Sequence, residues 1–288
     1  TFSKIGDIGV INLSDFMYRR ADNAGEMTES SVTLVRDAIL ALEKQNVRGY
    51  VLNLRNNRGG DLDFAVDIAG LFLGADKVVL NQRGRRPAYN KTLRTDGAAR
   101  DLTNGKPLIV LENGLTASAS EIDAGALQDH KRATIMGTQS FGKGSVQMVL
   151  PMQDGMPAGK ICLPEDGCSA LQLTIARYFS PDGHGVQNRG ITPDIVYVGP
   201  TSDDPAIRES VLPNALPDGG GASNPHKTSA TCRLAAKDTP VEAFDKAVIG
   251  PDGKPDGMLL CAIETLQGQS KYTITTPYAA PTAPALSQ

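Results

Sequence analysis

The chain has 288 residues, of which 40% are hydrophobic and 21% charged, a composition typical of soluble globular proteins rather than disordered or fibrous ones. Its net charge of −3 comes from 29 Lys and Arg against 32 Asp and Glu, so it lacks the positive excess that binds nucleic acid or an anionic membrane surface. No apolar run approaches the roughly 20 residues that cross a bilayer, and the first residues lack the pattern of a signal peptide. We therefore expect neither nucleic acid as a partner nor an integral membrane segment.

The first two thirds of the chain alternate between short apolar runs and segments with helical spacing, a pattern that predicts an α/β fold. We expect strands at 8–13, 49–54 and 107–111, and helices at 32–44, 64–71 and 121–127. The second and third strands run into loops of glycine and small residues, at 55–60 and 113–120. Both loops should meet at one edge of a sheet, where α/β proteins build their sites.

The remaining segments are less regular. Residues 78–106 are rich in Arg, Asn and Gly without a clear period, so we expect an insertion that lies over the sheet. Strands are expected at 171–179 and 190–197, the second closing a core of residues 1–198. Residues 199–227 read as a linker or long loop, followed by a small C-terminal segment at 228–275 with a helical pattern at 241–248. Residues 276–288 are expected to form a flexible tail.

The cysteines and histidines lack the spacing of a structural zinc site or a redox motif. The four cysteines are Cys162, Cys168, Cys232 and Cys261. The three histidines are His130, His184 and His226. The even number of cysteines favours disulfides, and with them an oxidising compartment, over four buried thiols, and it leaves their pairing open.

Two serines stand where the loop at 113–120 becomes a helix. A helix N-terminus offers unpaired N–H groups and a partial positive charge, which favour an oxyanion beside Ser118 or Ser120. Serine is also a preferred helix cap, and this segment alone favours a capping role.

Lys143 is flanked by glycines, so neighbouring backbone can approach it closely. A lysine amine that is desolvated loses its proton more readily and can activate a serine without any histidine. His130 is a poor candidate for that base, because about three helical turns separate it from Ser118. At a rise of ~1.5 Å per residue, this corresponds to ~18 Å along the helix. Taken alone, Lys143 also fits a surface lysine in a glycine turn.

Four motifs in unbroken order over residues 5 to 197 resemble those of the carboxyl-terminal processing proteases, also called tail-specific proteases, of peptidase family S41. The motifs are Asn53–Gly60, Ser118–His130, Gly137–Gln147 and Gly190–Ile195. The resemblance implies a crotonase/ClpP-like core of repeated strand-strand-helix units, with no metal or organic cofactor. It also implies a serine endopeptidase that cleaves proteins with accessible C-termini through an acyl-enzyme.

The same resemblance assigns roles to single residues. Ser118 is implied as the nucleophile, Lys143 as its general base, and Gln147 as the amide that orients the lysine amine. A neutral amide suits that position, since a carboxylate would stabilise the ammonium form. Lys143 should then be buried or otherwise discouraged from holding a proton, because free lysine keeps its proton up to about pH 10.4. Ser120 is the competing nucleophile, to which we give a capping or packing role.

The backbone N–H groups of Gly60 and Ala119 are implied as the oxyanion hole. The turn at 58–60 offers glycine backbone that a peptide carbonyl can approach closely. Arg58 departs from the family pattern, which more often has Pro or Gly at that position.

Members of this family usually carry a peptide-binding PDZ domain before the strand expected at 8–13, where this chain has only seven residues. We therefore expect a catalytic core without that domain, and a PDZ domain or adaptor as a partner. One alternative function is a peptide-binding scaffold whose dyad is idle until such a partner engages. Another is a crotonase-like acyl-CoA enzyme, which the Ser118 and Lys143 pair disfavours. The resemblance implies a periplasmic location, with the chloroplast lumen as the alternative.

Overall fold

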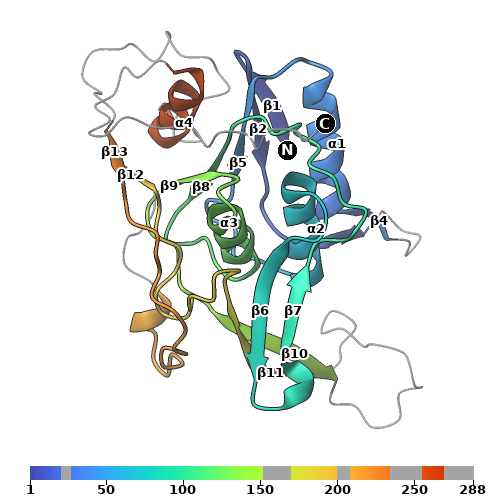
Figure 1. The fold of residues 1–288 in the computed structure, drawn as a ribbon, viewed down its shortest axis with the longest axis vertical. Helices are drawn as coiled ribbons and strands as arrows, with labels where there is room; N and C mark the ends of the chain where they lie inside the picture. The colour runs from blue at the N-terminus through green and yellow to red at the C-terminus, as the bar shows by residue number, and fades with distance from the viewer. Residues whose placement is uncertain (21–26, 152–169, 200–207, 234–254, 269–288) are drawn as a thin grey trace.

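The computed structural model describes residues 1–20, 27–151, 170–199, 208–233 and 255–268 (Figure 1). Its main sheet has seven strands in the order β1-β2-β5-β8-β9-β12-β13. They are β1 (Phe2–Ile5), β2 (Ile8–Asn12), β5 (Gly49–Asn53), β8 (Leu108–Glu112), β9 (Thr134–Gly137), β12 (Ile195–Val198) and β13 (Ala230–Arg233). Only β1 runs antiparallel to its neighbour, so the sheet is essentially parallel.

Helices cover both faces of this sheet. On one face lie α1 (Ser31–Glu43), α2 (Leu62–Leu73) and α3 (Ala119–Asp129), and on the other lies α4 (Gly257–Gln267). Alternate residues of β8 belong to the two cores: Leu108 and Val110 pack beneath α1 to α3, and Ile109 and Leu111 pack beneath α4. Because both faces are buried, the strands read as continuous apolar runs. The predicted strands 8–13, 49–54 and 107–111 correspond to β2, β5 and β8, and the three predicted helices to α1, α2 and α3.

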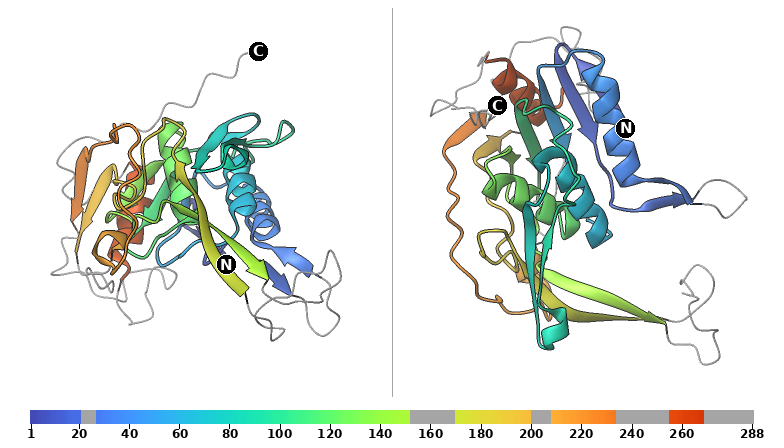
Figure 2. Two further views of the ribbon diagram at one scale, coloured as in Figure 1. Left: turned by 90° about the horizontal axis from the view of Figure 1, so that it is seen from below. Right: turned by 45° about the vertical axis from the view of Figure 1, so that its right-hand side comes forward.

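A second sheet of four antiparallel strands corrects the expectation of an irregular insertion at 78–106. It has the order β10-β11-β6-β7, with β6 (Val78–Gly84), β7 (Lys91–Arg94), β10 (Ser145–Pro151) and β11 (Ala170–Phe179). The register of β6 against β7 shifts between Val78 and Leu80, which breaks the alternation that marks a strand in sequence. The hairpin of β10 and β11 extends away from the helices (Figure 2).

The remaining described elements are short. β3 (Tyr18–Arg20) pairs with β4 (Met27–Ser30), and two 3₁₀ turns lie at Pro87–Tyr89 and Glu209–Val211. The strand predicted at 190–197 is shorter in the structure, because residues 190–194 form a loop and β12 begins at Ile195. None of the described helices combines the length and the apolar character needed to cross a membrane.

The C-terminal segment packs on the main sheet. β13 pairs in parallel with β12, and a disulfide joins Cys232 of β13 to Cys261 of α4. The guanidinium of Arg55, just after β5, forms a bidentate salt bridge with Asp256, the N-cap residue of α4. The division of the chain at residue 199 stays a prediction. The pattern at 241–248, the tail, and Cys162 with Cys168 lie outside the described residues.

Replacing Cys232 and Cys261 with serine is expected to lower the free energy of unfolding by about 3 to 4 kcal/mol. The disulfide closes a loop with a sequence separation of 29, and opening it gives the unfolded chain more conformations. Urea denaturation of the oxidised protein and of the double variant measures the difference. A difference below about 1 kcal/mol would contradict the expectation.

Candidate active site

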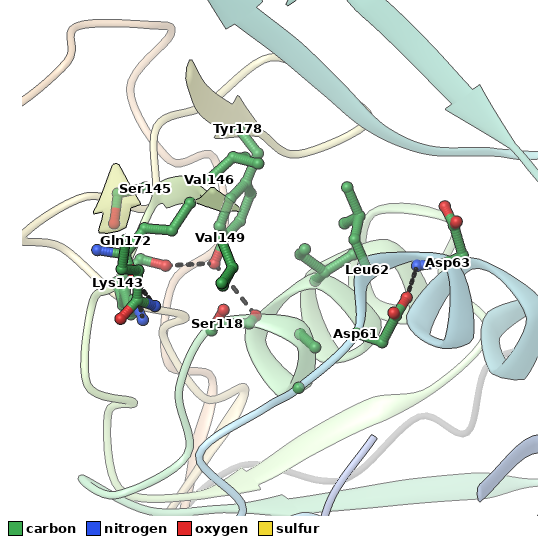
Figure 3. A pocket seen from close by; sticks show the side chains of 14 residues that line it. Asp61, Leu62, Asp63, Ser118, Lys143, Ser145, Val146, Val149, Gln172 and Tyr178 are labelled. Atoms are coloured by element: carbon green, nitrogen blue, oxygen red, sulfur yellow. Dashed lines mark hydrogen bonds between the residues drawn. The ribbon is translucent and has the colours of Figure 1, made fainter. Parts of the chain in front are cut away.

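One pocket of about 500 Å³ brings together all five residues that the sequence singled out. They are Gly60, Ser118, Ala119, Lys143 and Gln147. The pocket lies between the starts of α2 and α3 on one side and the β10–β11 hairpin on the other (Figure 3). The loops that follow β5 and β8 in the main sheet and the β10–β11 hairpin of the second sheet therefore build it.

Ser118 is half-buried at the N-cap of α3. Its φ of +59° is a left-handed conformation that serine rarely adopts and that tends to occur at functional sites. The loop before it is fixed to the loop after β5: Thr116 Oγ1 donates to Leu54 O at 2.9 Å, and the Ala117 N–H donates to Asn57 O at 3.0 Å. These bonds hold the serine against the glycine turn.

Ser120 does not share this exposure. It is fully buried, and its hydroxyl donates to Asn57 O at 2.9 Å. It therefore packs α3 against the loop after β5, in the role expected for it.

The glycine turn after β5 needs glycine at both positions. Gly59 and Gly60 have φ values of +94° and +153°. A Cβ on Gly59 would lie 2.7 Å from Ala119 N, and one on Gly60 would lie 2.3 Å from Phe16 O. The turn thus touches the start of α3. Within the described residues, neither Gly60 N–H nor Ala119 N–H donates to a protein acceptor, so both are available to a ligand in the pocket. The Arg58 side chain nearby is exposed.

Glu121 joins the two halves of the pocket. It is fully buried, and its Oε2 accepts hydrogen bonds from the backbone N–H groups of Ser118 and Lys143, each at 2.9 Å. Its Oε1 accepts from the Gly142 N–H at 2.7 Å and from Ser140 Oγ at 2.6 Å. Burial raises the pKa of this carboxyl, and the four donors oppose that rise. Glu121 was not among the predicted site residues, although the spacing Ser-x-x-Glu at a helix start is a capping signal.

Lys143 and Gln147 lie on the strand side of the pocket. Lys143 Nζ donates to Gln147 Oε1 at 3.4 Å, and Gln172 Nε2 donates to the same oxygen at 2.8 Å. The Tyr178 hydroxyl lies 2.7 Å from Lys143 O and 3.2 Å from Ser118 O, so it touches the backbone of both residues. Sequence reasoning missed Gln172 and Tyr178, since both come from β11 and no local pattern relates them to the motifs.

Lys143 is half-buried, so solvent reaches part of its side chain. The outer part of the β10–β11 hairpin that follows it is exposed on both faces, with Val149, Leu171 and Leu173 among its exposed residues. His130 lies elsewhere, with its Nε2 2.7 Å from Val78 O, as its distance along α3 predicts.

The rest of the pocket wall is apolar at its centre and acidic at one end. Leu62, Ile122 and Val149 supply apolar side chains, and Asp61 and Asp63 stand at the start of α2. Within the described residues, the set of three side chains suited to hold a metal ion lies outside this pocket.

Asp123 lies one turn into α3 and is expected to make stability fall as pH rises. It is fully buried without a hydrogen-bond partner in the described residues, and burial raises its pKa well above its usual value. A carboxyl with a raised folded pKa stabilises the fold below its unfolded pKa, near ~4, and this stability is lost as pH rises toward the folded pKa. We expect the free energy of unfolding of wild type to fall relative to that of Asp123→Asn between about pH 4 and pH 8. Urea denaturation at both pH values checks this, and a difference that does not change with pH would refute it.

The fold and the pocket together define an α/β protein with a crotonase/ClpP-like core. The chain belongs to peptidase family S41, whose model matches residues 7–197. The resemblance seen in the motifs and the expected fold class are thereby confirmed, and the acyl-CoA alternative loses its support.

Relatives in this family are carboxyl-terminal processing proteases. The chain is 46% identical over 196 residues to the carboxy-terminal-processing protease of Bartonella bacilliformis, covering 68% of this chain and 40% of that protein. It is 34% identical over 239 residues to the carboxyl-terminal-processing protease of Synechocystis sp., covering 81% and 49%. Among solved structures, the photosystem II D1 C-terminal processing protease matches with a TM-score of 0.50 and 30% identity, covering 66% and 42%. The chain thus spans less than half the length of these relatives.

Proposed function

We propose that this chain is the catalytic core of a serine endopeptidase that processes protein C-termini, with Ser118 as nucleophile and Lys143 as general base. The observation that carries the proposal is the shared pocket, in which Ser118, Lys143, Gln147 and two free backbone N–H groups face one space. The Glu121 carboxylate supports it, because it bonds the backbone of both dyad residues.

The geometry suggests the following sequence of steps. A substrate carbonyl oxygen accepts hydrogen bonds from the N–H groups of Gly60 and Ala119, and Ser118 Oγ attacks the carbonyl carbon while Lys143 takes its proton. The two N–H groups and the N-terminus of α3 stabilise the oxyanion of the tetrahedral intermediate. Lys143 then returns the proton to the leaving amine, and a water molecule hydrolyses the acyl-enzyme. Gln147 accepts a hydrogen bond from the lysine amine and adds no charge.

The same proposal extends to the substrates, the partner and the cellular compartment of the protein. The substrates are proteins or peptides with accessible C-termini, and a PDZ domain or adaptor is the partner that delivers them. The catalytic core comprises residues 1–198, and no metal or organic cofactor takes part. The disulfide between Cys232 and Cys261 supports an oxidising compartment, for which we propose the periplasm, with the chloroplast lumen as the alternative.

Cleavage of an unstructured protein with a C-terminal tail tests the proposal. Wild type is expected to release fragments whose masses place the cuts near the tail, and Ser118→Ala to release none, because the nucleophile is gone. Ser120→Ala is the matched control, since Ser120 is buried and bonded away from the pocket. Equal cleavage by wild type and Ser118→Ala would rule out the assignment.

A second candidate is a scaffold whose dyad is idle until a PDZ domain or partner engages. The half-buried Lys143, with its amine 3.4 Å from Gln147 Oε1, favours it, because a base needs desolvation to lose its proton readily. A phosphonylating reagent separates the two candidates. Rapid labelling of Ser118 in the isolated chain supports the active core, and labelling that appears only with a partner supports the scaffold.

A further inference from the structure

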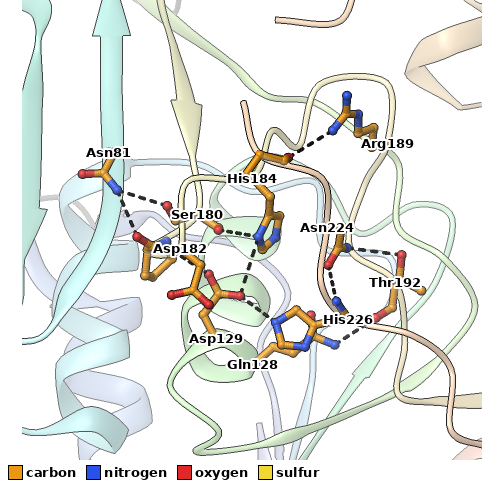
Figure 4. Close-up of polar contacts among 12 residues, drawn as sticks. Asn81, Gln128, Asp129, Ser180, Asp182, His184, Arg189, Thr192, Asn224 and His226 are labelled. Carbon is orange, nitrogen blue, oxygen red and sulfur yellow. Dashed lines mark hydrogen bonds and ion pairs between the residues drawn. The ribbon is translucent and has the colours of Figure 1, made fainter. Parts of the chain in front are cut away.

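A second polar cluster lies at the C-terminal end of α3, outside the pocket (Figure 4). It consists of Asp129, the last residue of α3, Asp182 in the turn after β11, and His226 in the segment before β13. One ligand atom from each of the three lies within 4.8 Å of the other two. Three segments far apart in the sequence thus contribute one side chain each.

The contacts leave one side of the cluster open. Asp129 Oδ1 lies 2.8 Å from His226 Nε2, and Asp129 Oδ2 accepts the backbone N–H of Asp182 at 2.9 Å. The Asp129 side chain is 1% exposed and that of His226 18%, while Asp182 is exposed. The cluster therefore has a buried carboxylate at its base and opens to solvent beside Asp182.

Charge in this cluster is incompletely balanced. Asp129 Oδ1 lies 2.8 Å from His226 Nε2 and 3.8 Å from His184 Nδ1, and Asp129 pairs with no lysine or arginine in the described residues. The Asp182 carboxylate adds a second negative charge beside His226. His184 is fully buried, and its Nε2 has no hydrogen-bond partner in the described residues. Two carboxylates thus meet one imidazole in this cluster, which favours binding of a positive ion.

We propose that Asp129, Asp182 and His226 bind one divalent transition-metal ion, of which zinc is the best fit. Two carboxylate oxygens and one imidazole nitrogen are a suitable donor set for zinc, with a fourth position left to water on the open side. Metal–ligand bonds of about 2.0 to 2.1 Å separate tetrahedral ligand atoms by roughly 3.3 Å, so Asp129 Oδ1 and His226 Nε2 need to move apart by only about 0.5 Å. The ion takes the place of the proton between those two atoms.

Neighbouring groups already orient two of the ligands, as the outer partners of metal ligands commonly do. The Asp182 N–H fixes the Asp129 carboxylate with Oδ1 toward His226. The His226 backbone N–H donates to Asn224 Oδ1 at 2.8 Å. A bound ion would link the end of α3, the turn after β11 and the segment leading to β13. The site is independent of the peptidase proposal, because none of its ligands lines the active-site pocket.

Calorimetric titration of the metal-stripped full chain with zinc chloride tests the proposal. We expect about one zinc ion per chain, bound with a dissociation constant in the micromolar range, and at least about tenfold weaker binding in Asp182→Asn and His226→Gln. His130→Gln is the matched control: it removes a histidine next to Asp129 whose ring contacts Val78 O, and it should bind zinc like wild type. Cobalt supplies a second readout, through visible absorption that wild type shows and the two ligand variants lose.

Two results would overturn the proposal. One is no zinc binding by wild type at millimolar concentration. The other is equally tight binding by wild type, Asp182→Asn and His226→Gln, which would place the ion elsewhere. Because Asp182 is exposed, its substitution is not expected to unfold the chain, and circular dichroism verifies this for each variant.

Discussion

Lys143→Ala is expected to lower kcat/KM for a tailed peptide by at least about 10³-fold, because Ser118 would lose the group that takes its proton. Lys143→Arg should be nearly as inactive, since a guanidinium keeps its positive charge but does not give up its proton in proteins. This pair of variants separates loss of a base from loss of a charge. The Lys143 side chain is half-buried at the edge of the hairpin, so neither change should unfold the chain.

The measurement is a steady-state assay over a range of pH, with circular dichroism as the check on folding. Lys91→Ala, which removes an exposed lysine of β7 in the same second sheet, is the matched control and should keep full activity. Activity of Lys143→Arg within about tenfold of wild type would contradict the role of Lys143 as general base.

Glu121→Gln is expected to lower kcat by about 10²-fold and to destabilise the chain by about 2 to 4 kcal/mol. Both carboxylate oxygens of Glu121 accept two hydrogen bonds each, so the amide nitrogen of glutamine would face two donors in a fully buried site. Losing those bonds frees the backbone of Ser118 and Lys143 and misaligns the dyad. Since the pocket wall is unchanged, KM should change much less than kcat.

Asp123→Asn is the matched control for Glu121→Gln. Asp123 is a fully buried carboxyl of the same helix but makes no hydrogen bond in the described residues, so its replacement should leave kcat unchanged. Thermal unfolding and the separate values of kcat and KM distinguish the two variants. If Glu121→Gln loses stability but keeps its kcat, Glu121 stabilises the fold and does not position the dyad.

The parts of this fold that sequence predicts are those whose signal is local. The strands and helices of the main sheet carry apolar runs and helical spacing within single segments, and the motifs place Ser118 and Lys143 in loops beside them. The strand expected at 171–179 is β11, whereas β6 and β7 escaped prediction. β6 pairs with β11, so that Gly84 lies opposite Ala176, and a register shift against β7 breaks its alternation.

In the candidate site, too, local sequence signals identified some residues and only the structure showed the others. Residue identities came from the motifs, and the pocket that they share came only from the structure. Glu121 could have been found from its capping spacing, whereas the contacts of Tyr178 depend on β11 packing beside α3, which neither segment encodes alone. Lys143 is only half-buried, and it stands beside a hairpin whose outer part is exposed.

The placement of the dyad on two different sheets has a consequence for control of activity. Ser118 follows a strand of the parallel sheet, whose two faces are covered, whereas Lys143 lies in the loop that leads into β10. Gln147 lies on β10, in a hairpin whose outer half is in contact with solvent. A molecule that contacts the outer hairpin therefore reaches the lysine amine through Gln147, its hydrogen-bond partner, while Glu121 holds the backbone of Lys143 and of Ser118.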